Sequence, residues 1–247
     1  MAVTLRRRPP GGAAAALPAI PRQVMAMAAV LVLGSFMTVL DLTIVNVALP
    51  RLEASFGSPL SVVQWVVTGY TLALATVLPV TGWAVDRWGG RRVFLVSVAL
   101  FTTGSGLCGV AWDTGSLIAF RVVQGAGGGL IVPVAMTLLL RAVPAERKGT
   151  AMAVLGVPVL IGPMTGPVLG GILTDALSWR WIFLVNLPVG VLTLVLGARL
   201  VPGGGEDPVR RPLDLLGLLT LSPGLASVFY GLTVAGEGGT PASAGAL

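Results

Sequence analysis

The sequence predicts an all-α integral membrane protein, and three observations support this prediction. Of its 247 residues, 55% are hydrophobic and only 11% are charged, whereas soluble domains carry about 25% charged residues. The mean hydropathy is +0.91. The apolar residues form runs long enough to cross a bilayer, because roughly 20 residues at 1.5 Å rise span the ~30 Å hydrocarbon core. The charged residues gather in the short breaks between these runs.

The apolar runs predict seven helices in chain order. The breaks between them carry turn formers or charges, as in Gly57-Ser58-Pro59, and such clusters end or interrupt helices. The predicted spans are residues 24–49, 60–82, 92–111, 115–140, 149–174, 180–201 and 213–235.

These spans divide the chain into five regions. We expect a cytoplasmic N-terminal tail at 1–23 and a six-helix bundle at 24–201. A cytoplasmic linker at 202–212 leads to the seventh helix at 213–235, and a short tail follows at 236–247.

The basic residues predict the orientation, because cytoplasmic loops are enriched in arginine and lysine. With a cytoplasmic N-terminus, thirteen of the 16 basic residues lie on the cytoplasmic side, Arg51 and Arg180 lie outside, and Arg121 lies within a span. The six tryptophans fall near predicted span ends, where indole rings prefer the headgroup layer. We therefore expect a multi-pass protein of the plasma (inner) membrane, with its N-terminus in the cytoplasm.

Composition also argues against several function classes. Histidine is absent and Cys108 is the single cysteine, so the chain lacks metal-ligand spacing and the usual catalytic triads. The +6 net charge forms no contiguous basic face of the kind that binds nucleic acid, and no phosphate-cradling loop follows a strand. We expect no enzyme activity, no metal, no nucleic-acid partner and no cofactor, and any uphill transport would need an ion gradient.

Two charges lie inside predicted spans. Asp41 is about eight residues, or ~12 Å, from the outer end of the first helix, and Arg121 is about six residues, or ~9 Å, from the same surface. Because buried charges in lipid pair or line a wet cavity, we expect them to face one shared polar cavity and to interact directly or through water, with Gln124 one turn after Arg121 on the same side. The alternative is a static ion pair that only locks two helices together.

The fifth span combines a glycine repeat with prolines. Its spacing makes one smooth groove for a neighbouring helix, and its prolines remove backbone donors and favour bends. Ordinary tight packing is one explanation, and a helix that bends and slides against its neighbour is the other. The residues are Gly162, Gly166, Gly170 and the adjacent Gly171, with Pro158, Pro163 and Pro167.

A short charged loop joins the second and third spans, from Gly82 to Leu95. Gly89 and Gly90 permit a tight turn. Arginines alone would anchor this loop to the cytoplasmic side, but the aspartate among them suggests a charge network that holds one conformation closed. The charged residues are Asp86, Arg87, Arg91 and Arg92.

Taken together, these motifs resemble the N-terminal half of a major facilitator superfamily transporter, specifically the 14-helix drug:proton antiporter family. The resemblance covers about residues 36–190, including the segment 179–190. The matching positions are Asp41, Thr43, Asn46, Ala48 and Pro50 in the first helix; Gly82, Asp86, Arg87 and Gly89 in the loop; Arg121, Gln124, Gly125 and Gly127 in the fourth helix; and Gly162, Pro163, Gly166, Pro167, Gly170 and Gly171 in the fifth.

The resemblance implies a six-helix bundle of inverted three-helix repeats plus a seventh, linker helix. It implies that Asp41, Asn46, Arg121 and Gln124 serve proton coupling and the substrate route. It further implies that Asp86 gates the cytoplasmic side against the opposite half, and that the fifth helix lines the interface between halves. Ala84 and Gly90 depart from the loop motif, which weakens the gate assignment.

The implied function is export of small molecules, such as drugs or natural products, by proton antiport. Such transporters are about twice as long as this chain, so we expect a truncated or partial transporter. A half-transporter acting as a homodimer and a non-transporting membrane subunit are the alternatives. The expected partners are membrane lipid, a small lipophilic substrate, protons, and either the missing C-terminal half or a second copy. Arginine-rich, lysine-poor usage points to a bacterial source.

Overall fold

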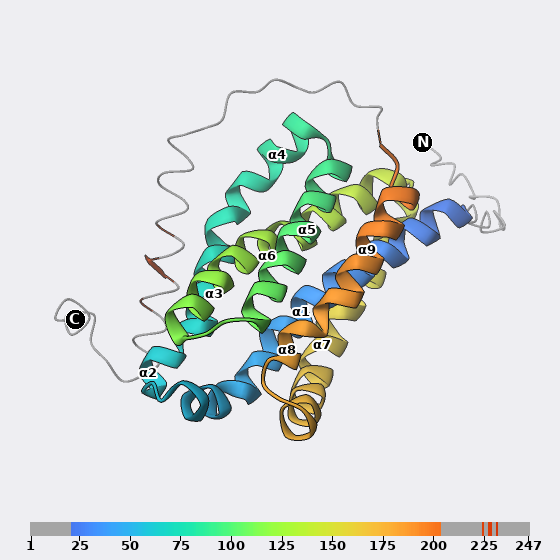
Figure 1. Cartoon of the computed structure of the whole chain (residues 1–247). Coiled ribbons are helices and arrows are strands. Elements are labelled where there is room, and N and C mark those ends of the chain that lie inside the picture. Colours follow the sequence, from blue (N-terminus) through green and yellow to red (C-terminus); the bar gives the residue numbers. More distant parts are fainter. Residues whose placement is uncertain (1–20, 204–223, 225–226, 229–230, 232–247) are drawn as a thin grey trace, which may run out of the picture.

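The computed structural model describes residues 21–203 together with 224, 227, 228 and 231, and its ordered elements are all helical within that part (Figure 1). Six of these helical segments are long and apolar enough to cross a membrane, judged by length and composition. They correspond to the first six predicted spans. The predicted tails at 1–23 and 236–247, the linker and the seventh helix at 213–235 lie largely or wholly outside the described residues.

The first helix is longer than predicted. Helix α1 runs from Arg22 to Phe56 and contains Pro50, where the prediction ended it at residue 49. Proline at this position removes one backbone donor without forcing the helix to stop. The helix ends instead at Gly57, which has φ 62° and donates its N–H to the carbonyl of Glu53, as in a left-handed glycine cap.

The second and third spans are joined almost without a loop. The second span consists of α2 (Leu60–Val63), α3 (Trp65–Val77), a 3₁₀ turn (Leu78–Val80) and α4 (Thr81–Trp88). Helix α5 (Gly90–Gly109) begins two residues later. The predicted loop is therefore wrong in extent, and the turn is made by Gly89 alone, whose φ of 82° few other residues adopt.

The second three-helix unit begins at a capped helix. Helix α6 (Thr114–Ala142) starts with a capping box between Asp113 and Ser116, which satisfies backbone donors at its N-terminus. After a 3₁₀ turn (Ala145–Arg147), α7 runs over Lys148–Ala176 and keeps Pro158, Pro163 and Pro167 inside one helix. The sixth span consists of α8 (Trp181–Leu184) and α9 (Asn186–Leu200).

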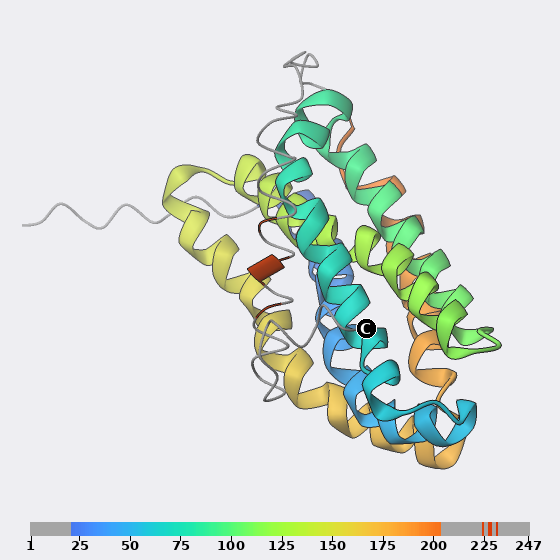
Figure 2. The ribbon, with the colours of Figure 1, turned by 90° about the vertical axis from the view of Figure 1, so that its left-hand side faces the viewer.

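The helix packing follows an inverted repeat. Helix α1 packs against α7 and α9, and in the matching positions of the second unit α6 packs against α3 and α5. Helices α5 and α9 also pack against each other, as do α1 and α6. Exchanging the two three-helix units therefore preserves the set of contacts, as expected for inverted repeats. Helix α7 lies at the edge of the bundle beside α1 (Figures 1 and 2).

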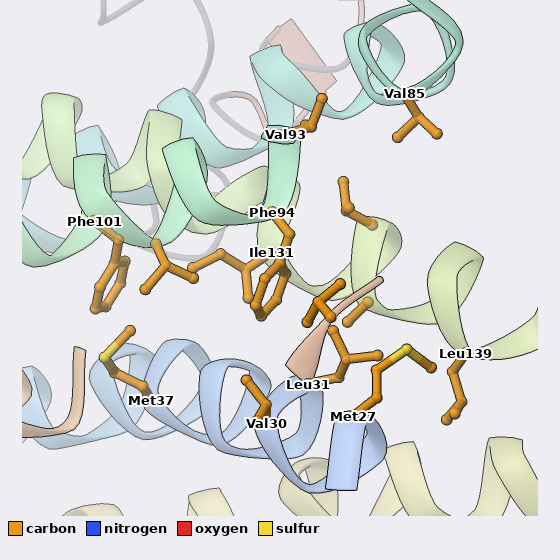
Figure 3. Close-up of a cluster of buried hydrophobic side chains, with 14 of the residues drawn as sticks. Met27, Val30, Leu31, Met37, Val85, Val93, Phe94, Phe101, Ile131 and Leu139 are labelled. Carbon is orange, nitrogen blue, oxygen red and sulfur yellow. The ribbon is translucent and has the colours of Figure 1, made fainter. Parts of the chain in front are cut away.

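The apolar interior is divided into two clusters. In the larger one, Met27 and Leu31 of α1 face Phe94 of α5 and Ile131 of α6 (Figure 3). The second gathers at the other end of the bundle around Ile44, Leu117 and Phe183. Along α1, Met37 belongs to the first cluster and Ile44 to the second, and Asp41 lies between them. The polar site therefore occupies the level that separates the two apolar cores.

Candidate functional site

The two intramembrane charges meet in the centre of the bundle. Nη1 of Arg121 on α6 lies 2.5 Å from Oδ2 of Asp41 on α1, and the side chains are 1% and 0% exposed. The expected proximity is therefore found, in the form of a direct ion pair enclosed by protein. Because burying two charges costs several kcal/mol each, the remaining polar atoms of both groups require partners.

Gln124 bridges the pair, as its position one turn after Arg121 predicts. Its Oε1 accepts from Nη1 of Arg121 at 2.9 Å, and its Nε2 donates to Oδ1 of Asp41 at 2.8 Å. This amide orientation follows from chemistry, because a guanidinium only donates and a charged carboxylate only accepts. The thiol of Cys108 lies 3.6 Å from the same Oε1.

Helix α3 supplies two further contacts to Arg121. Nε of Arg121 donates to the carbonyl of Val66 at 3.0 Å. The ring of Tyr70 lies against the guanidinium, 3.9 Å from Cζ to the ring centroid, and the ring of Phe183 lies 5.7 Å away on α8. Cation–π contacts of this kind stabilise a desolvated cation. The charge of Arg121 is thus balanced by one carboxylate, two oxygen acceptors and aromatic rings.

Asn186 is a member of the cluster that the sequence analysis missed. Its Nδ2 donates to Oδ1 of Asp41 at 3.2 Å and to Oγ of Ser105 at 3.1 Å, and both residues are buried. Asn186 is the first residue of α9, and Ser105 is on α5. A polar amide within an apolar span was the available signal, and it is weaker than the charge that singled out Asp41.

Glycines on α6 make the close approach of these helices possible. A Cβ added to Gly125 would lie 2.4 Å from the carbonyl oxygen of Tyr70, and one added to Gly127 would lie 2.5 Å from the backbone nitrogen of Phe101. Helices α3 and α5 therefore contact the backbone of α6 one turn beyond Arg121. Small residues at such contacts let helix backbones approach closely, and this approach brings Tyr70 over the guanidinium.

Asn46 does not join the buried cluster. Its side chain is exposed and donates to the carbonyl of Leu42, one turn earlier on α1, at 3.1 Å. The structure thus places Asp41 and Asn46 on different faces of the same helix.

The glycine repeat of α7 packs directly on α1. A Cβ on Gly162 would lie 2.6 Å from Cγ1 of Val39, and a Cβ on Gly166 would lie 2.0 Å from Oγ1 of Thr43. Oγ1 of Thr43 also donates to the carbonyl of Gly162 at 3.3 Å. Gly170 continues the stripe against Ile44. The groove predicted from the four-residue spacing is therefore occupied by α1.

The other motif residues of α7 lie outside that contact. A Cβ on Gly171 would meet no atom within 4 Å, and Pro163 and Pro167 are exposed. Exposed apolar side chains such as Leu160 and Met164 share this open face of the helix.

Of the residues expected to form the cytoplasmic gate, all but Gly82 line a cavity of about 760 Å³ between α4, α5, α6 and the end of α9. Oδ1 of Asp86 lies 3.8 Å from Nη2 of Arg141 on α6. Arg91 donates to the carbonyl of Ala198. Arg87 and Gly89 also line the cavity, whereas Gly82 is exposed and a Cβ on it would meet no atom within 4 Å.

An inverted-repeat bundle of membrane-length helices around a buried ion pair is an architecture found in membrane transporters. The chain belongs to the Major Facilitator Superfamily, whose family model matches residues 31–236.

Curated relatives carry multidrug names. The chain is 51% identical over 215 residues to a "Multidrug resistance protein B homolog" of Mycobacterium tuberculosis, covering 87% of this chain and 40% of that protein. It is 39% identical over 193 residues to "Multidrug export protein EmrB" of Haemophilus influenzae (78% and 38%) and 43% identical over 199 residues to "Putative multidrug resistance protein MdtD" of Yersinia enterocolitica (81% and 42%). The chain thus spans about two fifths of the length of these relatives.

A solved structure supports the fold. The human organic anion transporter MFSD10 (TETRAN) superposes with a TM-score of 0.64 at 19% sequence identity, covering 83% of this chain and 55% of that one. At this identity the likeness concerns the fold, which confirms the predicted superfamily bundle.

Proposed function

We propose that this chain is the N-terminal part of an exporter of small lipophilic molecules that is driven by proton antiport. The observation that carries the proposal is the buried contact between Asp41 and Arg121, 2.5 Å long and closed to solvent. The names of the multidrug relatives support export of such molecules. No cofactor beyond the proton gradient is needed for this function.

The ion pair gives the proposal a physical coupling step. Protonation of Asp41 would remove the one carboxylate that contacts Arg121 in this arrangement. A buried arginine without its counter-charge is unfavourable by several kcal/mol. Proton uptake would therefore favour a rearrangement in which α1 and α6 separate or Arg121 finds another partner, and this links a proton to helix movement. Asn46, on the exposed face of α1, would lie on the substrate side.

The remaining motif residues take two roles in this proposal. The cavity lined by Asp86, Arg87, Gly89 and Arg91 would act as the cytoplasmic gate. The open face of α7, including Pro163, Pro167 and Gly171, would lie against the other half of the transporter. Exposed apolar side chains on that face are suited to lipid or to such a partner.

The second half would come either from the additional length seen in the relatives or from a second copy of this chain. The protein would lie in a bacterial inner membrane with a cytoplasmic N-terminus, so that the basic loops face the cytoplasm. A chain that neither transports nor pairs with another half would be a non-transporting membrane subunit.

The test is proton-linked transport by everted membrane vesicles that contain the protein. We expect uptake of a fluorescent lipophilic cation that a protonophore abolishes and that Asp41→Asn reduces at least about tenfold, whereas Asp175→Asn, which changes an exposed carboxylate, leaves it intact. Cross-linking in the same membranes identifies a homodimer. Uptake by Asp41→Asn with an unchanged pH profile would refute proton coupling through this residue.

A further inference from the structure

Asn186 on α9 contacts Asp41 on α1. The other two side chains that donate to Asp41, Arg121 and Gln124, are both on α6. Three donors converge on the carboxylate: Nη1 of Arg121 at 2.5 Å on Oδ2, and Nε2 of Gln124 at 2.8 Å and Nδ2 of Asn186 at 3.2 Å on Oδ1. Hydrogen bonds donated to a carboxylate favour its charged form. Of the three donors, only Asn186 lies outside the Arg121–Gln124 pair.

Ser105 fixes the direction of the Asn186 amide. The single hydroxyl proton of Ser105 is donated to the carbonyl of Phe183 at 2.9 Å. That carbonyl lies in the last turn of α8, where it also faces the backbone N–H of Val185. Ser105 is thus left to accept from Asn186, whose second N–H points to Asp41.

The chain of bonds therefore has one polarity. Ser105 can accept but has no second proton to give, and the carboxylate of Asp41 only accepts. The amide nitrogen of Asn186 must face both oxygens, so its donors are held toward Asp41. The side chains in this cluster are at most 2% exposed, so water does not compete for these donors. They are Ser105, Asn186, Asp41, Arg121 and Gln124.

We propose that Asn186, oriented by Ser105, is a positioning residue that stabilises the charged form of Asp41 and so sets the pH range in which this carboxylate takes up a proton. The proposal rests on the proposed function, in which Asp41 is the proton carrier. It assigns a coupling role to α9 and α5, the third helices of the two repeats. These helices pack against α1 and α6, which carry the ion pair.

Other titratable groups around Asp41 come from neighbouring helices. Arg121 on α6, Tyr70 on α3 and Cys108 on α5 interact with it. Helices α7 and α9 carry their charges near their ends; Arg199 is thirteen residues beyond Asn186, roughly 20 Å along the helix. Since none of these groups is changed by substitutions at Asn186 or Ser105, such variants isolate the donated hydrogen bond.

The experiment follows protonation of Asp41 directly, in the 247-residue chain reconstituted in lipid bilayers. The infrared band of its protonated carboxyl group is assigned by its loss in Asp41→Asn and is then measured against pH. In Asn186→Leu we expect the midpoint of this band to move upward by about one pH unit, since the charged form has lost a donor. Ser105→Ala should shift it in the same direction by less.

Matched variants separate this role from a general effect on packing. Thr193→Val changes a buried side chain on α9 that bonds only its own helix at Val189, and Ser97→Ala makes the Ser105 change at another buried serine of α5, bonded to Val93. Both should leave the midpoint where it is. Asn186→Ser keeps a donor, so its midpoint should move upward by less than that of Asn186→Leu. This variant also allows the test if Asn186→Leu folds poorly.

A midpoint that is the same in Asn186→Leu as in the unaltered chain would overturn the proposal. So would an equal shift in Thr193→Val, or the absence of an Asp41 band from both the unaltered chain and Asn186→Leu between about pH 4 and 10. Transport is not needed for this measurement. A shift in Asn186→Leu without proton-linked uptake in vesicles would therefore refute transport by this chain acting alone or as a homodimer, and would leave the role of Asn186 standing.

Discussion

Helix α1 carries one member of each of two ion pairs whose geometry is nearly the same. Asp41 lies 2.5 Å from Arg121 on α6, and Arg51 lies 2.6 Å from Asp175 on α7. The first pair is at most 1% exposed, whereas the side chains of the second are 56% and 71% exposed. The two pairs thus differ in surroundings rather than in distance.

This difference decides what each pair does. Exposed pairs are worth about 0.2–1 kcal/mol, because water and salt screen them. Removing one partner from a buried pair costs about 3–5 kcal/mol, because the remaining charge has no solvent. Distance alone would rank the two contacts as equals, and burial distinguishes a pair that is closed to solvent from a surface contact.

The largest expected effect comes from breaking the buried pair. Arg121→Leu should lower the free energy of unfolding by about 3–5 kcal/mol, because Asp41 stays buried without its cation. Equilibrium unfolding in mixed detergent micelles measures this loss. The double variant Asp41→Leu/Arg121→Leu should recover most of it, since apolar replacement of both partners is often neutral. A double variant as unstable as the single one would show that charge is not the cause.

A second effect tests what holds α1 against α7 near the exposed pair. Gly166→Ala should cost about 1–3 kcal/mol, because the new Cβ would lie 2.0 Å from Oγ1 of Thr43 and must push the helices apart. The matched variant Gly171→Ala meets no atom within 4 Å and should gain about 0.5–1 kcal/mol from helix propensity. The same unfolding assay compares them. Equal behaviour of the two variants would contradict close packing as the main contact.

The exposed pair itself should contribute little. Asp175→Asn should lower stability by about 0.2–1 kcal/mol at low salt, and the loss should shrink as salt is added. Unfolding of the variant and of the unaltered chain at two ionic strengths measures both parts of this prediction. A loss as large as that of Arg121→Leu, or one independent of salt, would mean that the pair is shielded from water.

The smallest effect concerns Asp113, a solvent-exposed carboxylate that caps the N-terminus of α6. The N–H and hydroxyl of Ser116 hold the pKa of Asp113 below its usual value of 3.8. Its stabilisation is therefore present above that value and lost as pH falls through the lower pKa of the folded state. Asp113→Ala should flatten the fall in Tm over this acidic range. An unchanged pH dependence would argue against the cap.

The central pair was predictable because charge is conspicuous in an apolar span. Counting residues from the span ends put Asp41 and Arg121 at similar depth, and their contact is found. Gln124 followed from helical spacing. The glycine repeat of α7 likewise predicted a close helix contact, and α1 occupies it. In each case one residue type and one periodicity carried the information.

The remaining site could not be predicted in the same way. The carbonyl of Val66 accepts from Arg121, and no sequence pattern singles out a backbone acceptor. Asn186 is neutral, and burying a neutral amide costs less free energy than burying a charge. Its position in an apolar span is therefore a weaker indication of a functional site. Span ends were also missed: α1 continues through Pro50, and helices extend to Trp88 and resume at Gly90, because tertiary packing overrides local breaking signals.

The polar layer between the two apolar cores has a consequence for how the helices are aligned. Contacts among Val, Leu and Phe side chains are non-directional, so packed apolar surfaces tolerate small axial slips. The bonds that join Asp41 to α6 and α9 do not, because a shift of one residue, about 1.5 Å, would break them. The cluster therefore pins the vertical register of three helices, much as one buried polar residue fixes alignment in a coiled coil.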